Sequence, residues 1–167
     1  EGNKRHQRIG VATSTDLNTW TPADTVVLSA PSILWAKKNP PTGGPYLGAQ
    51  QLRDPFVMAD PVHPGQWLMY FVAEDSLHSP KMAVGVAKST DLVHWTALEK
   101  PFSSTERPTS QGATNIVESP HVFRRNGQWW MPYTVNLDQV FFETSASADP
   151  ADTVAAHWTN PVWLRGV

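Results

Sequence analysis

Short apolar runs separated by turn residues make up this chain, and no stretch keeps a helical period. Four such runs occupy residues 56–59, 66–73, 82–88 and 95–98. Their lengths and spacing predict short β-strands, and turn signals such as Asn126-Gly127 punctuate the chain between later runs. The run at 66–73 is apolar on both faces, which predicts a strand buried between two neighbouring sheets.

The strand pattern repeats. Residues 9–21 match residues 84–96 at most positions and share Gly-Val-Ala, Ser-Thr-Asp-Leu and Trp, and a looser copy follows after Val140. The segment 65–71 returns as 127–133, and Trp95 returns as Trp158 after nearly the same interval. One period shared by several markers indicates a repeat protein, and four-stranded sheets repeated around an axis form a β-propeller.

The repeat divides the chain into blades. It predicts the outer half of a first blade at 1–29, a connection at 30–52, a second blade at 53–101, a connection at 102–117 and a third blade at 118–167. Projecting the period backwards places the inner strand of the first blade about 20 residues before Glu1. Since closed propellers need about four to eight blades, we expect an all-β, partial propeller with about two and a half blades.

Open edges follow from a partial propeller. We expect the sheet face that carries Met131 and Tyr133 to meet water. We also expect the unpaired strand edges to bind the remainder of the propeller or a second copy of the chain.

Two proline motifs begin the predicted inner strands of the second and third blades. Arg53-Asp54-Pro55 and Glu118-Ser119-Pro120 each place a carboxylate just before a proline, and close to one period separates the two carboxylates. Equivalent positions of a radial repeat converge on one axis, so we expect Asp54 and Glu118 to meet at one site. A single Asp-Pro is ordinary turn chemistry, but the repeated placement favours a functional pair.

Other repeated residues have simpler explanations. Asp16 and Asp91 fall on the outer half of their units, where an aspartate that caps a turn is expected. Trp20, Trp95 and Trp158 share one outer position, which is typical of packing residues.

Composition narrows the function classes. With 13 basic and 15 acidic side chains, the chain has no electrostatic footprint for nucleic acid or a membrane surface. No apolar run reaches the about 18 residues of a transmembrane helix, and no signal peptide is visible. The absence of cysteine excludes disulfides and thiolate metal sites but leaves the compartment open.

In its two proline motifs and its repeated blade segment, the sequence resembles the five-bladed β-propeller glycoside hydrolases of families 43 and 32. Arg53-Asp54-Pro55 is similar to family 32, whereas Glu118-Ser119-Pro120-His121 is similar to family 43, since family 32 typically has Cys where this chain has Ser119. In these families an Asp of the first blade, an Asp of the second and a Glu of the third meet at the axis. The resemblance implies that Asp54 orients substrate and stabilises the transition state, and that Glu118 is the general acid. The first-blade Asp, the base or nucleophile, falls in the segment projected before Glu1.

The resemblance implies a glycosidase acting on furanosides or on pentose- or fructose-containing oligosaccharides. Such cleavage needs a protonated acid at the leaving oxygen, and a nearby Asp54 carboxylate would keep Glu118 protonated by like-charge repulsion. A non-catalytic carbohydrate-binding propeller is the alternative. We expect a carbohydrate partner and no metal or other cofactor, and the substrate class favours a secreted or periplasmic protein.

Three further residues are candidate sugar contacts. Arg53 either holds Asp54 ionised or binds a sugar hydroxyl. His121 either lines the pocket or satisfies a backbone hydrogen bond. Trp35, in the Pro- and Gly-rich connection 30–52, forms either a stacking wall for a sugar ring or a hydrophobic plug that holds the connection down.

Overall fold

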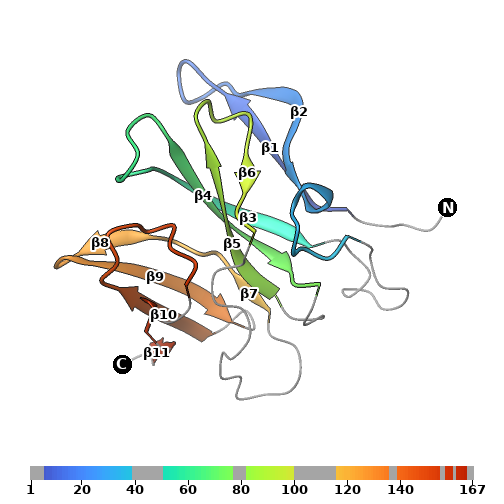
Figure 1. The fold of residues 1–167 in the computed structure, drawn as a ribbon. Coiled ribbons are helices and arrows are strands. Elements are labelled where there is room, and N and C mark those ends of the chain that lie inside the picture. The colour runs from blue at the N-terminus through green and yellow to red at the C-terminus, as the bar shows by residue number, and fades with distance from the viewer. Residues whose placement is uncertain are drawn as a thin grey trace.

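The computed structural model describes residues 6–38, 51–76, 82–99, 116–135, 139–154, 157–159 and 161–164. Within these residues, strands arranged in three antiparallel sheets make up most of the regular structure, and a short 3-10 turn spans Ala30–Ser32. The sheets lie side by side in chain order and fan out from one another (Figure 1). The all-β prediction is confirmed.

Each sheet is a meander of consecutive strands. The first pairs β1 (Arg8–Thr13) with β2 (Thr21–Ser29). The second contains, in chain order, β3 (Leu52–Ala59), β4 (Trp67–Glu74), β5 (Met82–Ser89) and β6 (Thr96–Ala97). The third contains β7 (Val117–Glu118), β8 (Phe123–Arg125), β9 (Gln128–Val135), β10 (Gln139–Ser145) and β11 (Val162–Leu164), with β7 and β8 both paired to β9. Antiparallel units of this kind are the blades of a propeller.

The strands of the second sheet lie close to their predicted positions. β4 and β5 differ from the predicted runs by a residue, whereas β3 begins at Leu52, earlier than the predicted 56, and includes the Arg53-Asp54-Pro55 motif. Much of the two predicted connections, residues 39–50 and 100–115, lies outside the described residues. The limits of the blades therefore stay a prediction.

β4 is buried on both faces, as its sequence predicted. Leu68, Tyr70 and Val72 join one apolar cluster with residues of β9 in the third sheet. Met69 and Phe71 alternate with them along the strand and join a second cluster with residues of the first sheet. The second sheet is therefore covered by a neighbour on each side.

The prediction that Met131 and Tyr133 meet water is wrong. They are 0% and 1% exposed, because their side of β9 packs against β4. Side chains alternate along a strand, so the opposite face of β9 carries Trp130. The Trp130 ring stacks on Phe142 and Phe123 at centroid distances of 5.0 and 6.5 Å, and Phe123 is 38% exposed.

A glycine permits close packing between the first two sheets. The rings of Trp35 and Phe71 stack with centroids 6.0 Å apart, and a Cβ added at Gly85 would clash with Phe71 Cζ and lie 2.6 Å from Trp35 Cζ2. At Gly10, the matching residue of the first sheet, the same atom would meet only the Thr25 carbonyl oxygen, at 3.9 Å. Trp35 is 5% exposed, and this burial supports the plug alternative over a sugar-stacking wall.

The outer turns carry the predicted aspartate caps. Asp16 Oδ1 accepts hydrogen bonds from the backbone N–H groups of Asn18 and Thr19, at 2.9 and 2.8 Å. Asp91 Oδ1 accepts the matching bonds from Val93 and His94, at 2.9 and 2.7 Å. These aspartates hold turns, as expected.

The tryptophans that follow these turns are not equally buried. Trp158 is 6% exposed, and its Nε1 donates to the Asp152 carbonyl oxygen at 2.9 Å. Trp20 is 54% exposed, so the packing prediction is wrong for it. Within the described residues, the first sheet has a neighbouring sheet on one face only, which leaves Trp20 uncovered.

Candidate active site

The two proline motifs share an unusual backbone. Asp54 and Ser119, each directly before a proline, have φ angles of 56° and 53°, in the left-handed region that few non-glycine residues adopt. Both motifs interrupt strand pairing: the register of β3 shifts between Arg53 and Phe56, and the same interruption separates β7 from β8. Such irregularities turn side chains out of the normal alternation of a strand.

Pairing registers show which residues correspond. Arg53 pairs with Val72 of β4, and Glu118 pairs with Thr134 of β9. The interval from Val72 to Thr134 is the one that relates segment 65–71 to segment 127–133. Glu118 therefore corresponds to Arg53, and Asp54 to Ser119. The expectation that the two carboxylates occupy the same position is off by one residue, because Asp54 directly precedes its proline and Glu118 does not.

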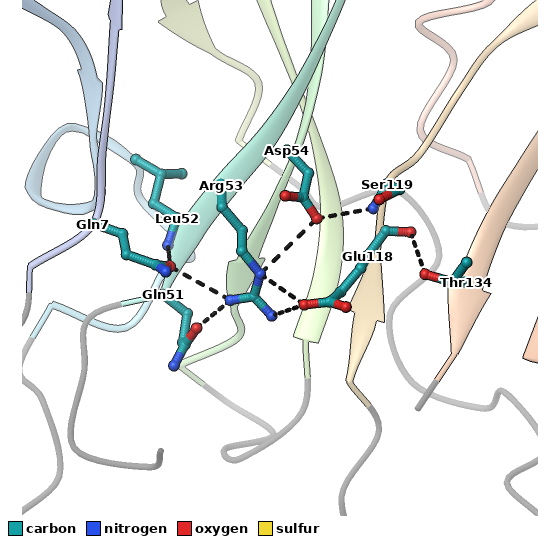
Figure 2. Close-up of polar contacts among 8 residues, drawn as sticks. All are labelled: Gln7, Gln51, Leu52, Arg53, Asp54, Glu118, Ser119 and Thr134. Carbon is teal, nitrogen blue, oxygen red and sulfur yellow. Dashed lines mark hydrogen bonds and ion pairs between the residues drawn. The ribbon is translucent and has the colours of Figure 1, made fainter. Parts of the chain in front are cut away.

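The two carboxylates nonetheless gather around one guanidinium group (Figure 2). Arg53 Nη2 and Nε lie 2.8 and 3.0 Å from Glu118 Oε1, and Nε lies 3.9 Å from Asp54 Oδ2. Because both carboxylates contact Nε, these two oxygens are no farther apart than the sum of the 3.0 and 3.9 Å contacts. The structure thus brings Arg53, Asp54 and Glu118 together, while their catalytic roles stay a prediction.

Two groups of the third sheet hold the Asp54 carboxylate and the Glu118 backbone. The Ser119 N–H donates to Asp54 Oδ2 at 2.9 Å, and Thr134 Oγ1 donates to the Glu118 carbonyl oxygen at 3.2 Å. Asp54 Oδ1 and Glu118 Oε2 make no hydrogen bond with any residue that the structure describes. Both side chains are partly exposed, at 27% and 22%. Each carboxylate therefore keeps one oxygen for a ligand.

Two glutamines hold the opposite side of the guanidinium. Gln7 Oε1 accepts hydrogen bonds from the Leu52 N–H at 3.1 Å and from Arg53 Nη1 at 3.4 Å, and Gln51 Oε1 also accepts from Nη1. The sequence carried no signal for Gln7, which lies just before the first repeated segment. The pairing of Arg53 with Glu118 was also missed, although aligning the two prolines would have indicated it.

A cavity opens beside this cluster. It has a volume of about 500 Å³ and is lined by residues 6–10 around the start of β1 and by residues 52–55 of β3, including Arg53 and Asp54. Small-molecule sites commonly enclose about 300–1,000 Å³, and the volume of this cavity falls within that range.

The other two predicted contacts lie away from the guanidinium. The His121 ring packs on Phe56, with centroids 4.0 Å apart, and its backbone N–H donates to the Pro132 carbonyl oxygen at 3.0 Å. Trp35 lies in the apolar cluster between the first and second sheets. Trp35 packs in this cluster, and the sugar contacts of His121 and Trp35 both stay predictions.

The described residues show neither a metal-ligand cluster nor a membrane-spanning helix. In the described part of the chain, no group of three or more His, Cys, Asp or Glu side chains is placed to hold a metal ion. None of the described helical segments is long and apolar enough to cross a membrane.

The charge of the cluster suits glycoside chemistry. The Arg53 guanidinium and the Asp54 carboxyl group line the cavity, and the Glu118 carboxyl group pairs with the same guanidinium. Glycosidic cleavage passes through an oxocarbenium-like transition state, whose positive charge such a cluster would stabilise.

Solved structures with the same fold place the chain in context. A β-xylosidase/α-arabinofuranosidase from a compost microbial metagenome, in complex with xylotriose, has a TM-score of 0.58 at 16% identity and is matched over 92% of this chain and 47% of its own. A β-fructofuranosidase catalytic domain from Microbacterium saccharophilum K-1 has a TM-score of 0.58 at 19% identity, over 90% and 39%. An α-L-arabinanase from Penicillium chrysogenum, in complex with arabinobiose, has a TM-score of 0.54 at 17% identity, over 94% and 40%.

These matches confirm the predicted fold, a five-bladed β-propeller of which this chain forms a part. The chain spans less than half the length of each of these structures. No curated protein matches the sequence. The sequence profile of the glycosyl hydrolases family 43 matches residues 47–167, which include both proline motifs. The chain therefore belongs to the glycosyl hydrolases family 43.

Proposed function

We propose that the chain is part of a glycosidase that hydrolyses O-glycosidic bonds of furanosides or of pentose- or fructose-containing oligosaccharides. The observation that carries this proposal is the convergence of Asp54 and Glu118 on the Arg53 guanidinium beside a cavity. Membership of family 43 supports the reaction class. Solved propellers of this fold bind xylotriose or arabinobiose, which supports a carbohydrate substrate.

Glu118 is the proposed general acid. Its Oε1 accepts both Arg53 hydrogen bonds, so Oε2 is the atom that would carry the proton to the leaving oxygen. The bond between the anomeric carbon and that oxygen breaks as the proton arrives. Thr134 holds the Glu118 backbone from the neighbouring strand, which limits how far the acid can move.

Asp54 is the proposed substrate-orienting carboxylate. Its Oδ2 is held by the Ser119 N–H and lies near Arg53 Nε, so Oδ1 would accept a sugar hydroxyl or face the developing positive charge. Arg53 would bind a sugar hydroxyl from the same side. His121, close to Phe56, is a proposed wall of the sugar site.

The third carboxylate of the reaction, the base or nucleophile, is proposed to come from outside these residues. The remainder of the propeller would supply it, so we propose that the active protein contains more blades than the three sheets described. The predicted division at 1–29, 53–101 and 118–167 is part of this proposal.

Assay of the full-length protein tests the reaction. We expect turnover of at least one among 4-nitrophenyl α-L-arabinofuranoside, 4-nitrophenyl β-D-xyloside, arabino-oligosaccharides, xylo-oligosaccharides and sucrose. We expect kcat/KM of the Asp54→Asn variant, made in parallel, to fall about 10²-fold. No turnover across the panel, with a correctly folded protein by circular dichroism, would contradict the proposal.

A non-catalytic carbohydrate-binding propeller is the second candidate. The ion pair between Arg53 and Glu118 favours this non-catalytic alternative. A general acid must carry a proton, whereas Glu118 Oε1 accepts hydrogen bonds from two N–H groups of Arg53. Calorimetric titration with the same oligosaccharides separates the two. Saturable binding without turnover would select the binding propeller.

A further inference from the structure

Gln7 is the one side chain of the first sheet's edge that bonds to the Arg53 guanidinium among the described residues. It directly precedes β1 and is far from Arg53 in sequence. Figure 2 shows Gln7 and Leu52 on one side of the guanidinium, and the carboxylates of Asp54 and Glu118 on the other. Its contact therefore joins the first sheet to the cluster made by the second and third.

Hydrogen-bond chemistry fixes the orientation of the Gln7 amide. Both partners of its Oε1, the Leu52 N–H and Arg53 Nη1, are donors without acceptor capacity. The oxygen must therefore face them. The NH₂ group of Gln7 makes no hydrogen bond with the residues that the structure describes, so turning the amide over would lose both bonds and replace them with donor–donor contacts.

The Leu52 bond anchors the Gln7 side chain. Leu52 is 1% exposed and, as the first residue of β3, pairs with Ala73 of β4, so its backbone is fixed by the sheet. Once Oε1 is held on this N–H, it presents a fixed acceptor to Nη1. The planar guanidinium then has its Nη1 corner on Gln7 and Gln51 and its Nε and Nη2 edge on Glu118.

We infer that Gln7 is a positioning residue that sets the orientation of Arg53 at the glycoside-cleaving site. Gln7 does not touch the carboxylates in this arrangement. It fixes the guanidinium plane so that Nε and Nη2 face Asp54 and Glu118. The inference rests on the proposed function, because it assigns Gln7 a part in that reaction. A small displacement of a positioned group costs catalysis far more than it costs stability.

Two substitutions of similar size separate the effect of the Gln7 hydrogen-bond acceptor from the effect of its side-chain volume. Gln7→Met keeps the length of the side chain and removes the acceptor, so we expect kcat/KM of the full-length protein to fall about tenfold. Gln7→Glu keeps an oxygen that can accept from Leu52 and Arg53, so we expect kcat/KM within about threefold of the unsubstituted protein. Gln128→Met is the matched control, since Gln128 is an exposed glutamine at the start of β9.

A double-mutant cycle tests whether Gln7 acts through Arg53. In an Arg53→Met background, Gln7→Met should change kcat/KM by less than about twofold, because the group that it positions is gone. A merely structural role would give the same tenfold loss in both backgrounds. Equal losses for Gln7→Glu and Gln7→Met, or no loss for Gln7→Met, would also overturn the inference.

A crystal structure of the Gln7→Met protein gives a readout that does not depend on turnover. We expect the guanidinium of Arg53 to turn, with its Nε–Nη2 edge displaced from Glu118 Oε1. An unmoved guanidinium would overturn the inference. If the unsubstituted protein shows no turnover on the substrate panel, the proposed reaction fails, and the position of Arg53 in this crystal structure still decides the role of Gln7.

Discussion

The outer turns and the axial ends of the blades repeat in different ways. The outer turns at Ser14-Thr15-Asp16-Leu17 and Ser89-Thr90-Asp91-Leu92 repeat side chains, hydrogen bonds and even the positive φ of their leucines. The axial motifs at Arg53-Asp54-Pro55 and Glu118-Ser119-Pro120 repeat the proline and the positive φ before it, while the other side chains differ.

The difference follows from where the hydrogen bonds go. In the outer turns of the first and second sheets, the aspartate bonds to groups of its own turn, so each of these two turns needs the same residue for itself. At the axis, Arg53 bonds to Glu118 and Asp54 accepts the Ser119 N–H, so contacts run from one blade to the next. The axial side chains of two neighbouring blades must therefore be complementary to each other, and they cannot be identical. Axial substitutions should therefore alter activity, and substitutions at the outer turns should alter stability.

The largest effect is expected for Glu118→Gln. The amide keeps the shape of the acid but cannot donate a proton of the right strength, so kcat/KM on oligosaccharides with poor leaving groups should fall about 10²–10⁴-fold. Aryl glycosides with good leaving groups should be largely spared, since they need little protonation. Kinetics on both substrate classes check this. Equal losses on both would contradict the general-acid role.

Asp54→Asn should damage both substrate classes. The Asn oxygen can still accept the Ser119 N–H, so the fold should persist while the negative charge beside the sugar is lost. We expect kcat/KM to fall about 10²-fold whatever the leaving group. A loss confined to poor leaving groups would move the acid role from Glu118 to Asp54.

The sequence predicted the fold well because its signals are local. The two-faced apolar run of β4 and the turn residues reflect how a buried strand and its connections must be built, and both lie where expected. The face of β9 was assigned wrongly, because alternation along a strand shows that two faces exist but not which neighbour covers each. Met131 faces β4, and Trp130 faces away.

The site was only partly predictable. Repetition brought Asp54 and Glu118 to one place, but their one-residue offset was missed, although the position of each carboxylate relative to its proline shows it. The positive φ angles of Asp54 and Ser119 have no sequence signal, since neither residue is glycine. Arg53 was expected to hold Asp54 ionised or to bind a sugar hydroxyl, and the shorter of its two ion pairs is the one with Glu118. Gln7 was missed because its role depends on the packing of two sheets, which no local pattern records.

Away from the axis too, equivalent positions of the repeat should differ in how tightly they are packed. Gly10 and Gly85 occupy matching positions, but only Gly85 lies under the rings of Phe71 and Trp35. Gly85→Ala should lower the free energy of unfolding by about 2–3 kcal/mol, because those rings must move. Gly10→Ala should cost much less. Chemical denaturation of both variants measures the difference, and equal costs would show that the close packing is not needed.

The outer turns and the axial motifs share a left-handed backbone conformation, so substitution by glycine should have a similar effect on stability in both regions. Leu17 and Ser119 have φ angles of 61° and 53°, and a left-handed conformation costs a residue with a Cβ about 1–2 kcal/mol. Glycine removes that cost but loses more chain entropy on folding. We expect Leu17→Gly and Ser119→Gly each to stabilise by about 0.5–1 kcal/mol. Destabilisation by Ser119→Gly alone, seen in denaturant titrations, would mean that its hydroxyl has a structural role.

The smallest effect on the free energy of unfolding is expected at acidic pH, from the outer turn of the first sheet. Hydrogen bonds from the Thr19 and Asn18 N–H groups lower the pKa of Asp16 from 3.8 to about 2. The unfolded chain therefore binds a proton at higher pH than the folded protein does, and the stabilisation from Asp16, complete above its unfolded pKa, is lost as the pH falls towards 2. Asp16→Asn cannot titrate, so its unfolding free energy should fall less steeply across this window. The unsubstituted protein, measured in parallel, gives the reference slope. Denaturant unfolding at a series of acidic pH values measures both slopes, and an unchanged slope in Asp16→Asn would show that the turn does not draw its stability from this carboxylate.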